Sequence, residues 1–165
     1  PLSGVKFTHL EGGIRVPFLL KYGNQFKAST TFDHPISTFD LLPTFANVAG
    51  LSEEGMEYLD GVNLISFLNG KKQFRPHETL YWKNDAQAAI RDGDWKLIRM
   101  PDRPALLFNI AKDPNEKKDL AQKYPKKVEK LYKKLFAWET TLKRSLWVTR
   151  REIIQMGIEA FDKYR

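Results

Sequence analysis

Apolar and polar residues follow two different periods along the chain, and the period changes near residue 71. Beyond that point, four short runs rich in aromatic and branched side chains are separated by polar turns, which is typical of β-strands. The expected strands are 78–83, 87–91, 95–100 and 105–110, with Asp92-Gly93-Asp94 as a strong hairpin signal. Short strands joined by tight turns predict a four-stranded antiparallel sheet, one face of which needs a covering helix.

Helical spacing accounts for much of the remaining chain. Pro125 can open a helix that covers the sheet, because apolar residues follow it three or four positions apart. These residues are Val128, Leu131, Leu135, Trp138 and Leu142. A second apolar stripe in the tail 146–165 predicts another helical segment. Nearer the N-terminus, we expect a helix that ends at Gly50 and is capped by Thr38 or Asp40, and a short one that ends at Gly70.

The stretch GVKFTHLEGGIRVPF, residues 4–18, joins a charged, glycine-rich turn to an apolar run. The apolar run predicts a buried strand of about five to seven residues, made of Ile14, Val16 and Phe18–Leu20. Such a turn would place a charged side chain at the rim of a sheet. The candidates are Lys6, His9, Glu11 and Arg15. On the residues alone, a structural ion pair between Glu11 and Arg15 beside a solvated Lys6 remains an open interpretation.

Composition limits the class of protein. With 165 residues and 42% hydrophobic content, the chain is expected to be globular, and the absence of cysteine excludes disulfides, thiolate metal sites and a cysteine nucleophile within these residues. No apolar run is long enough to span a bilayer. The net charge of +7 suits nucleic acid, a membrane surface or an anionic polysaccharide. Because no nucleic-acid-binding motif is present, a solvated basic face over 112–151 is the preferred interpretation, and no nucleic-acid partner is expected.

Residues 4–17 resemble G-x-K-x-x-x-x-E-G-G-x-R-V-P, a motif found late in the formylglycine-dependent sulfatases of the alkaline phosphatase superfamily. Further segments resemble the same family in the same order. They are STFDLLPT (37–44), DGVNLISFLNG (60–70), HETLYW (77–82), AAIRDGDWKLIR (88–99) and LFNIAKDPNEKKDLA (107–121). The resemblance implies an α+β fragment. Residues 1–70 would end an alkaline phosphatase-like α/β sulfatase domain, and 71–165 would form a small subdomain with the four-stranded sheet and its covering helix.

The same resemblance implies a function. The complete protein would hydrolyse sulfate esters, either of a sulfated glycan or of an aryl sulfate, with calcium and a formylglycine made from C/S-x-P-x-R. Neither that motif nor the family's Asp-Asn metal segment occurs here, so this chain is expected to hold no metal and to be inactive alone. It begins at Pro1 without Met, and we expect an N-terminal sulfatase portion as its partner. A periplasmic or extracellular location in a bacterium follows from the family.

Lys6 occupies the position of the family's sulfate-binding lysine and is the predicted catalytic residue. His9, His77 and Trp82 are candidate substrate contacts, and Tyr81 and Arg91 are also of types that suit a sugar. A core aromatic cluster is the preferred interpretation for Tyr81 and Trp95.

Two alternatives stay open. The first is a phosphonate or phosphodiester hydrolase of the same superfamily. The second is a non-catalytic basic module that binds an anionic polymer through 117–134.

Overall fold

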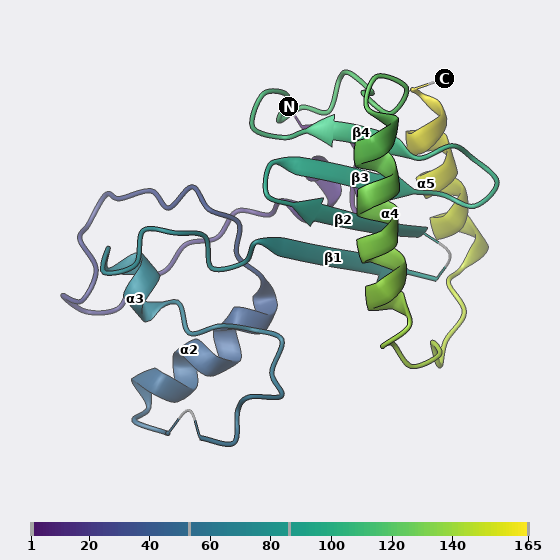
Figure 1. Cartoon of the computed structure of the whole chain (residues 1–165). Coiled ribbons are helices and arrows are strands. Elements are labelled where there is room, and N and C mark those ends of the chain that lie inside the picture. Colours follow the sequence, from purple (N-terminus) through teal and green to yellow (C-terminus); the bar gives the residue numbers. More distant parts are fainter. Residues whose placement is uncertain (1, 53, 86, 165) are drawn as a thin grey trace. The chain divides into compact units, whose positions relative to one another are not determined.

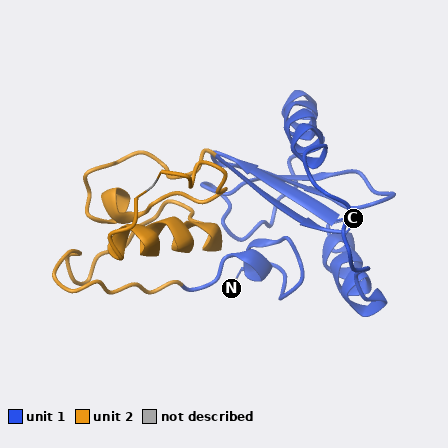
Figure 2. Cartoon of the chain, turned by 90° about the horizontal axis from the view of Figure 1, so that it is seen from below, with its two compact units in different colours: residues 1–17, 79–165 blue, residues 18–78 orange. Residues whose placement is uncertain are grey.

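The computed structural model describes residues 2–52, 54–85 and 87–164 (Figure 1). The chain forms two compact units, one made of residues 1–17 with 79–165 and the other of residues 18–78 (Figure 2). The division at residue 70 expected from the sequence concerns the subdomains of a complete sulfatase and stays a prediction.

The first unit is built on an antiparallel sheet with the strand order β1-β2-β3-β4 (Figure 1). Its strands are β1 (Thr79–Asn84), β2 (Gln87–Asp92), β3 (Trp95–Arg99) and β4 (Leu106–Asn109). Each strand pairs with the next through a short turn, and Gly93 adopts φ +61° in the β2–β3 hairpin. The four strands and their order confirm the prediction, because alternation with period two and tight turns are local signals.

Helix α4 (Pro125–Glu139) covers one face of this sheet, as expected. Its buried Leu131 and Leu135 lie in one cluster with Ile90 of β2, Leu97 of β3 and Leu107 of β4. Two aromatic residues extend this contact toward β1, since the rings of Tyr81 and Trp138 stack with centroids 4.7 Å apart. Trp95 also packs against this cluster. The core role preferred for Tyr81 and Trp95 is therefore confirmed.

Helix α5 (Arg151–Asp162) covers the opposite face of the sheet (Figure 2). Its Ala160 and Phe161 lie in a second buried cluster with Ile98, Phe108 and, from the start of the chain, Leu10. The sequence analysis predicted helical structure in this tail, but it assigned a covering helix to only one face of the sheet. The unit therefore has three layers, with a helix on each side of the sheet.

The second unit contains the short helices η1 (Thr38–Asp40), α2 (Leu41–Val48) and α3 (Ile65–Leu68). The buried Asp40 carboxylate accepts hydrogen bonds from the backbone N–H of Ser37, at 2.7 Å, and of Val62, at 2.8 Å. Ser37 is the N-cap of η1, in place of the Thr38 or Asp40 expected from the sequence, and Asp40 completes a capping box with it. The structural role predicted for Asp40 is therefore confirmed, but its predicted role as the capping side chain is not. Gly50 and Gly70 adopt φ +76° and +79° at the ends of α2 and α3, where the sequence placed them.

The buried strand predicted over residues 14–20 is wrong. Residues Glu11–Ile14 form a single helical turn, α1, and residues 15–22 are in neither strand nor helix. Val16 is 67% exposed and Leu19 is 95% exposed. An extended apolar segment becomes a strand only when a neighbour pairs with its backbone, and none of the strands that the structure describes does so. Among the described residues, no helix is long and apolar enough to cross a membrane.

Candidate functional site

The turn that carries Lys6, residues 3–12, is closed by hydrogen bonds between its own residues. The N–H of Gly12 donates to the carbonyl of Ser3 at 2.6 Å, and the Thr8 hydroxyl donates to the carbonyl of Val5 at 2.7 Å. A Cβ on Gly12 would lie 2.6 Å from the carbonyl oxygens of both Ser3 and Gly4, so this close approach requires glycine. The motif glycines therefore let the two ends of the turn touch.

Lys6 lies at the exposed tip of this turn. Its Nζ is 5.1 Å from the centroid of the Phe7 ring, and Phe7 adopts the uncommon φ of +76°. Within the described part of the chain, no ion pair joins Lys6 to an acidic side chain. A lysine on a fixed turn without an internal counter-ion is suited to contact an anionic ligand.

One interpretation of the sequence paired Glu11 with Arg15. In the structure Glu11 has other partners. Its carboxylate accepts a hydrogen bond from Lys96 of β3 at 2.8 Å. The same ammonium donates to Glu116 at 2.8 Å, and the second oxygen of Glu116 accepts from the Glu11 backbone N–H at 2.6 Å. Glu11 is 2% exposed and Lys96 and Glu116 are fully buried, whereas Arg15 is exposed. Glu11 therefore holds the turn, but with partners that the sequence analysis did not identify.

This buried cluster contains two carboxyl groups and one ammonium. Burial raises the pKa of Glu116 above its ordinary value, although the Lys96 ammonium opposes the change. Glu116 also adopts φ +51°, so its backbone is held in the left-handed region. Because its pKa is raised, the Glu116 carboxyl holds its proton to a higher pH in this cluster than it would in water.

His9 lies inside the first unit, with an exposed fraction of 8%. Burial, together with the nearby Lys96 ammonium, lowers its pKa to about 4, so the imidazole is neutral at neutral pH. Its Nδ1 and the Nε2 of Gln87 have no hydrogen-bond partner among the described atoms, and both residues line a cavity of about 10 Å³ beside Gly157. A substrate contact through His9 stays a prediction.

The other two candidate substrate contacts belong to different units. Trp82, on β1, packs against the cluster that contains Ala89 and Phe161. His77 belongs to the second unit, where its Nε2 lies 2.7 Å from Oδ1 of Asp40. The structure therefore brings Lys6 and His9 together in one turn and assigns His77 a partner that the sequence did not suggest. Their roles toward a substrate stay predictions.

The residues that the structure describes do not offer a calcium site. No group of three or more His, Asp or Glu side chains in residues 2–52, 54–85 and 87–164 is arranged to hold a metal ion. The Glu11 carboxylate, which lies in the Lys6 turn, is already bonded to Lys96.

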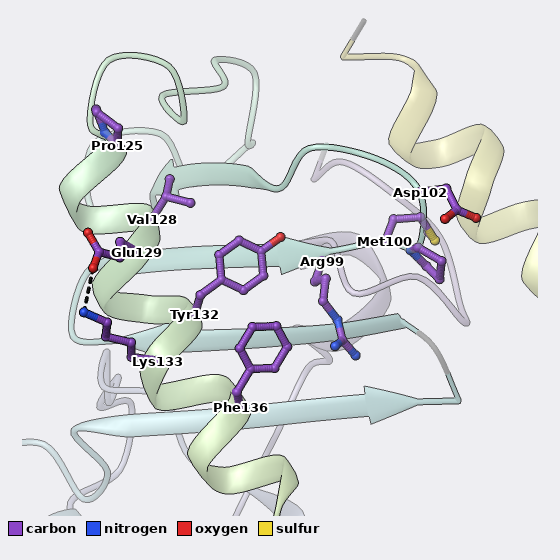
Figure 3. A pocket seen from close by; sticks show the side chains of 10 residues that line it. Arg99, Met100, Asp102, Pro125, Val128, Glu129, Tyr132, Lys133 and Phe136 are labelled. Atoms are coloured by element: carbon purple, nitrogen blue, oxygen red, sulfur yellow. Dashed lines mark hydrogen bonds and ion pairs between the residues drawn. The ribbon is translucent and has the colours of Figure 1, made fainter.

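An open groove of about 630 Å³ lies between α4 and the end of β3 (Figure 3). The stacked rings of Tyr132 and Phe136 form part of its wall, with centroids 5.3 Å apart, and the Arg99 guanidinium lies over Phe136. Two ion pairs involve groove residues, since Glu129 bonds Lys133 and Arg99 bonds Glu139. The groove thus presents mainly aromatic and aliphatic surface, and Lys6 does not line it.

The chain belongs to the N-sulphoglucosamine sulphohydrolase C-terminal family, whose model matches residues 6–144. This family assignment confirms the resemblance drawn from the sequence motifs.

Curated relatives are also sulfatases. The chain is 34% identical over 121 residues to a choline-sulfatase of Rhizobium meliloti, with 71% of this chain and 23% of the relative covered. It is 31% identical over 161 residues to a sulfatase of Formosa agariphila, with 84% and 29% covered. The chain thus spans about a quarter of the length of these relatives.

A solved structure extends the match over nearly the whole chain. The crystal structure of Ps i-CgsB in complex with k-i-k-neocarrahexaose is 30% identical, with a TM-score of 0.77, and covers 99% of this chain and 38% of the other. The similarity includes the C-terminal tail that the family model leaves unmatched. Helix α5 therefore has a counterpart in a solved structure.

Proposed function

We propose that the complete protein is a sulfatase that hydrolyses sulfate esters of a sulfated glycan, and that this chain supplies Lys6 as a sulfate contact. The observation that carries the proposal is the closed turn, which presents an exposed lysine from a fully buried anchor. Glycan as the substrate class is supported by the similarity to a structure solved with a carrageenan-type oligosaccharide. Neither the phosphonate alternative nor the basic-module alternative has better support.

Lys6 would act through charge. Cleavage of a sulfate ester builds negative charge on the leaving oxygen and on the nonbridging oxygens, and a fixed ammonium stabilises that charge in a site shielded from water. Because the turn is already closed, little reorganisation is needed when the transition state forms. The formylglycine nucleophile and calcium would come from outside this chain, and together they would supply the attacking oxygen and further charge stabilisation.

The N-terminal sulfatase portion would be the partner of this chain. The apolar segment that includes Val16 and Leu19 is exposed here, and burial of such side chains contributes roughly 1.5–3 kcal/mol each. We propose that this segment packs against the N-terminal portion in the complete enzyme. From the family, we also propose that the complete enzyme is located in the periplasm or outside the cell of a bacterium.

The test is turnover by the complete enzyme, with an aryl sulfate and with sulfated carrageenan oligosaccharides as substrates. Lys6→Ala is expected to lower kcat about 10²–10³-fold, the usual cost of removing one charge-stabilising donor. Lys21→Ala removes another exposed lysine nearby in the sequence and should leave kcat unchanged. Equal turnover in wild type and Lys6→Ala would remove Lys6 from the sulfate site.

The gene gives an independent check. The sequence upstream of Pro1 should contain C/S-x-P-x-R and an Asp-Asn pair, and their absence would overturn the sulfatase proposal. The basic-module alternative predicts instead that this chain alone binds heparin in a salt-sensitive manner, unaffected by Lys6→Ala.

A further inference from the structure

Both ends of the Lys6 turn are tied to one short segment that follows β4. The Ser3 hydroxyl donates to the carbonyl of Asn115 at 2.6 Å, across 112 positions of sequence. The Glu11 backbone N–H donates to the Glu116 carboxyl, across 105 positions. Lys6 lies between these two ties. Residues 115 and 116 therefore anchor both ends of the turn, which the bond from the Gly12 N–H to the Ser3 carbonyl also joins directly.

Lys96 fixes this segment to the sheet. It stands opposite Phe108 in the β3–β4 pairing, so its backbone position is set by the ladder of hydrogen bonds on both sides. Its ammonium bonds both Glu11 and Glu116 at 2.8 Å. Since all three side chains are buried, water does not compete for these bonds, and their geometry is correspondingly well defined.

A cluster of this kind is a poor way to gain stability, because desolvation of the charges offsets much of their attraction. Its geometric effect is larger, since it joins β3, the segment after β4 and the Lys6 turn at a single point. A displacement of about 1 Å in a group that contacts the reacting atoms can cost 10²-fold in rate. Any change that loosens Glu116 is therefore transmitted to the Lys6 tip.

We propose that Glu116 and Lys96 are positioning residues for Lys6. They act through the turn and do not themselves touch the substrate. This proposal rests on the proposed function, because it gives the cluster an effect on rate only if Lys6 contacts the sulfate.

A double-mutant cycle in the complete enzyme tests the proposal, with kcat and KM measured separately. Glu116→Ala should lower kcat about 10–100-fold in the presence of Lys6 and less than about twofold in the Lys6→Ala background. Glu116→Gln keeps one of the two acceptor oxygens, so it can still accept from either Lys96 or the Glu11 N–H and should recover part of the kcat. A loss of the same factor in both backgrounds would show a general structural role and overturn the positioning proposal.

Ser3→Ala provides a second, milder variant for the case in which Glu116→Ala does not fold. It removes the bond to the carbonyl of Asn115 and the contact of the Ser3 hydroxyl with Tyr164. Ser145→Ala, which removes an exposed hydroxyl bonded to the carbonyl of Trp147, is its matched control. Ser3→Ala should lower kcat only when Lys6 is present, and Ser145→Ala should not lower it in either background.

The two proposals fail in different ways. If Lys6→Ala alone leaves turnover unchanged, the role of Lys6 in the proposed function is refuted and there is nothing to position. If Lys6→Ala lowers kcat as expected but the Glu116 and Ser3 losses are additive with it, only the positioning proposal is refuted.

Discussion

Lys96 donates a hydrogen bond of 2.8 Å to Glu11, which lies 85 positions earlier in the chain. Together with Glu116 this pair forms a buried cluster in which each charged group depends on the others. Removal of one member leaves an uncompensated buried charge, whereas replacement of a whole cluster by apolar residues is often nearly neutral. The change in stability therefore depends strongly on which side chains of the cluster are replaced.

Lys96→Met is expected to destabilise the chain by about 3–5 kcal/mol, because it leaves two carboxyl groups buried without their ammonium. Chemical denaturation of the 165-residue chain would measure this loss. Lys126→Met is the matched control, since Lys126 is exposed in the first turn of α4 and its substitution should stay within about 0.5 kcal/mol. Similar losses in the two variants would contradict the burial of Lys96.

Glu116→Gln is expected to change how stability depends on pH. The raised pKa means that the folded chain holds a proton on Glu116 that the unfolded chain has already released, so stability falls as pH rises through the window between the two pKa values. Gln cannot titrate and should abolish this fall. Unfolding free energies of wild type and variant, measured from pH 4 to 8, should diverge in favour of the variant toward higher pH.

His9 should show the opposite dependence. Its pKa is 6.5 in the unfolded reference and about 4 in the folded chain, so its contribution is present above pH 6.5 and is lost as pH falls toward 4. The full loss is on the order of 3 kcal/mol, at 1.36 kcal/mol per pKa unit. Titration of the imidazole by NMR checks the origin directly, and a His9 midpoint near 6.5 would contradict the burial seen here.

An ordered water is expected beside His9. The cavity of about 10 Å³ matches the space that one water needs, and the unpaired Nδ1 of His9 and Nε2 of Gln87 offer it two polar partners. A crystal structure at high resolution should show density within about 3 Å of both atoms. A rotated Gln87 that bonds elsewhere, with no density in the cavity, would be evidence against this water.

Asp40→Ala is expected to destabilise the second unit by about 2–4 kcal/mol. It leaves the N–H groups of Ser37 and Val62 without their acceptor and removes the partner of His77. Asp33→Ala changes an exposed aspartate in the same unit and should have little effect. Amide hydrogen exchange should accelerate at Val62 in the first variant and not in the second.

The sheet and α4 could be predicted because their signals are local. Turn residues such as Gly93 and the three-and-four spacing of Leu131 and Leu135 depend only on near neighbours. The prediction over residues 14–20 failed for the opposite reason. A run such as Val16 to Leu20 shows that a segment is apolar, but whether it forms a strand depends on a backbone that must pair with it.

The candidate site could be predicted only in part. Lys6 stands in a motif, so a resemblance to a family reaches it, whereas nothing local connects Lys96 with Glu11 or Glu116. One weak signal was present, because Lys96 shares the alternation of a buried strand with Ile98 and must then find a buried acid. Which acid it finds is a tertiary contact that spacing in the sequence does not specify.

The ties between the Lys6 turn and the segment after β4 also bear on when the site forms during synthesis. Residue 11 leaves the ribosome long before residue 116, yet the Glu11 N–H finds its acceptor only on Glu116. Contacts of such long range form late, after the intervening chain has closed its loop. The lysine that is translated among the first residues of this chain therefore acquires its final position only after most of the chain has been made.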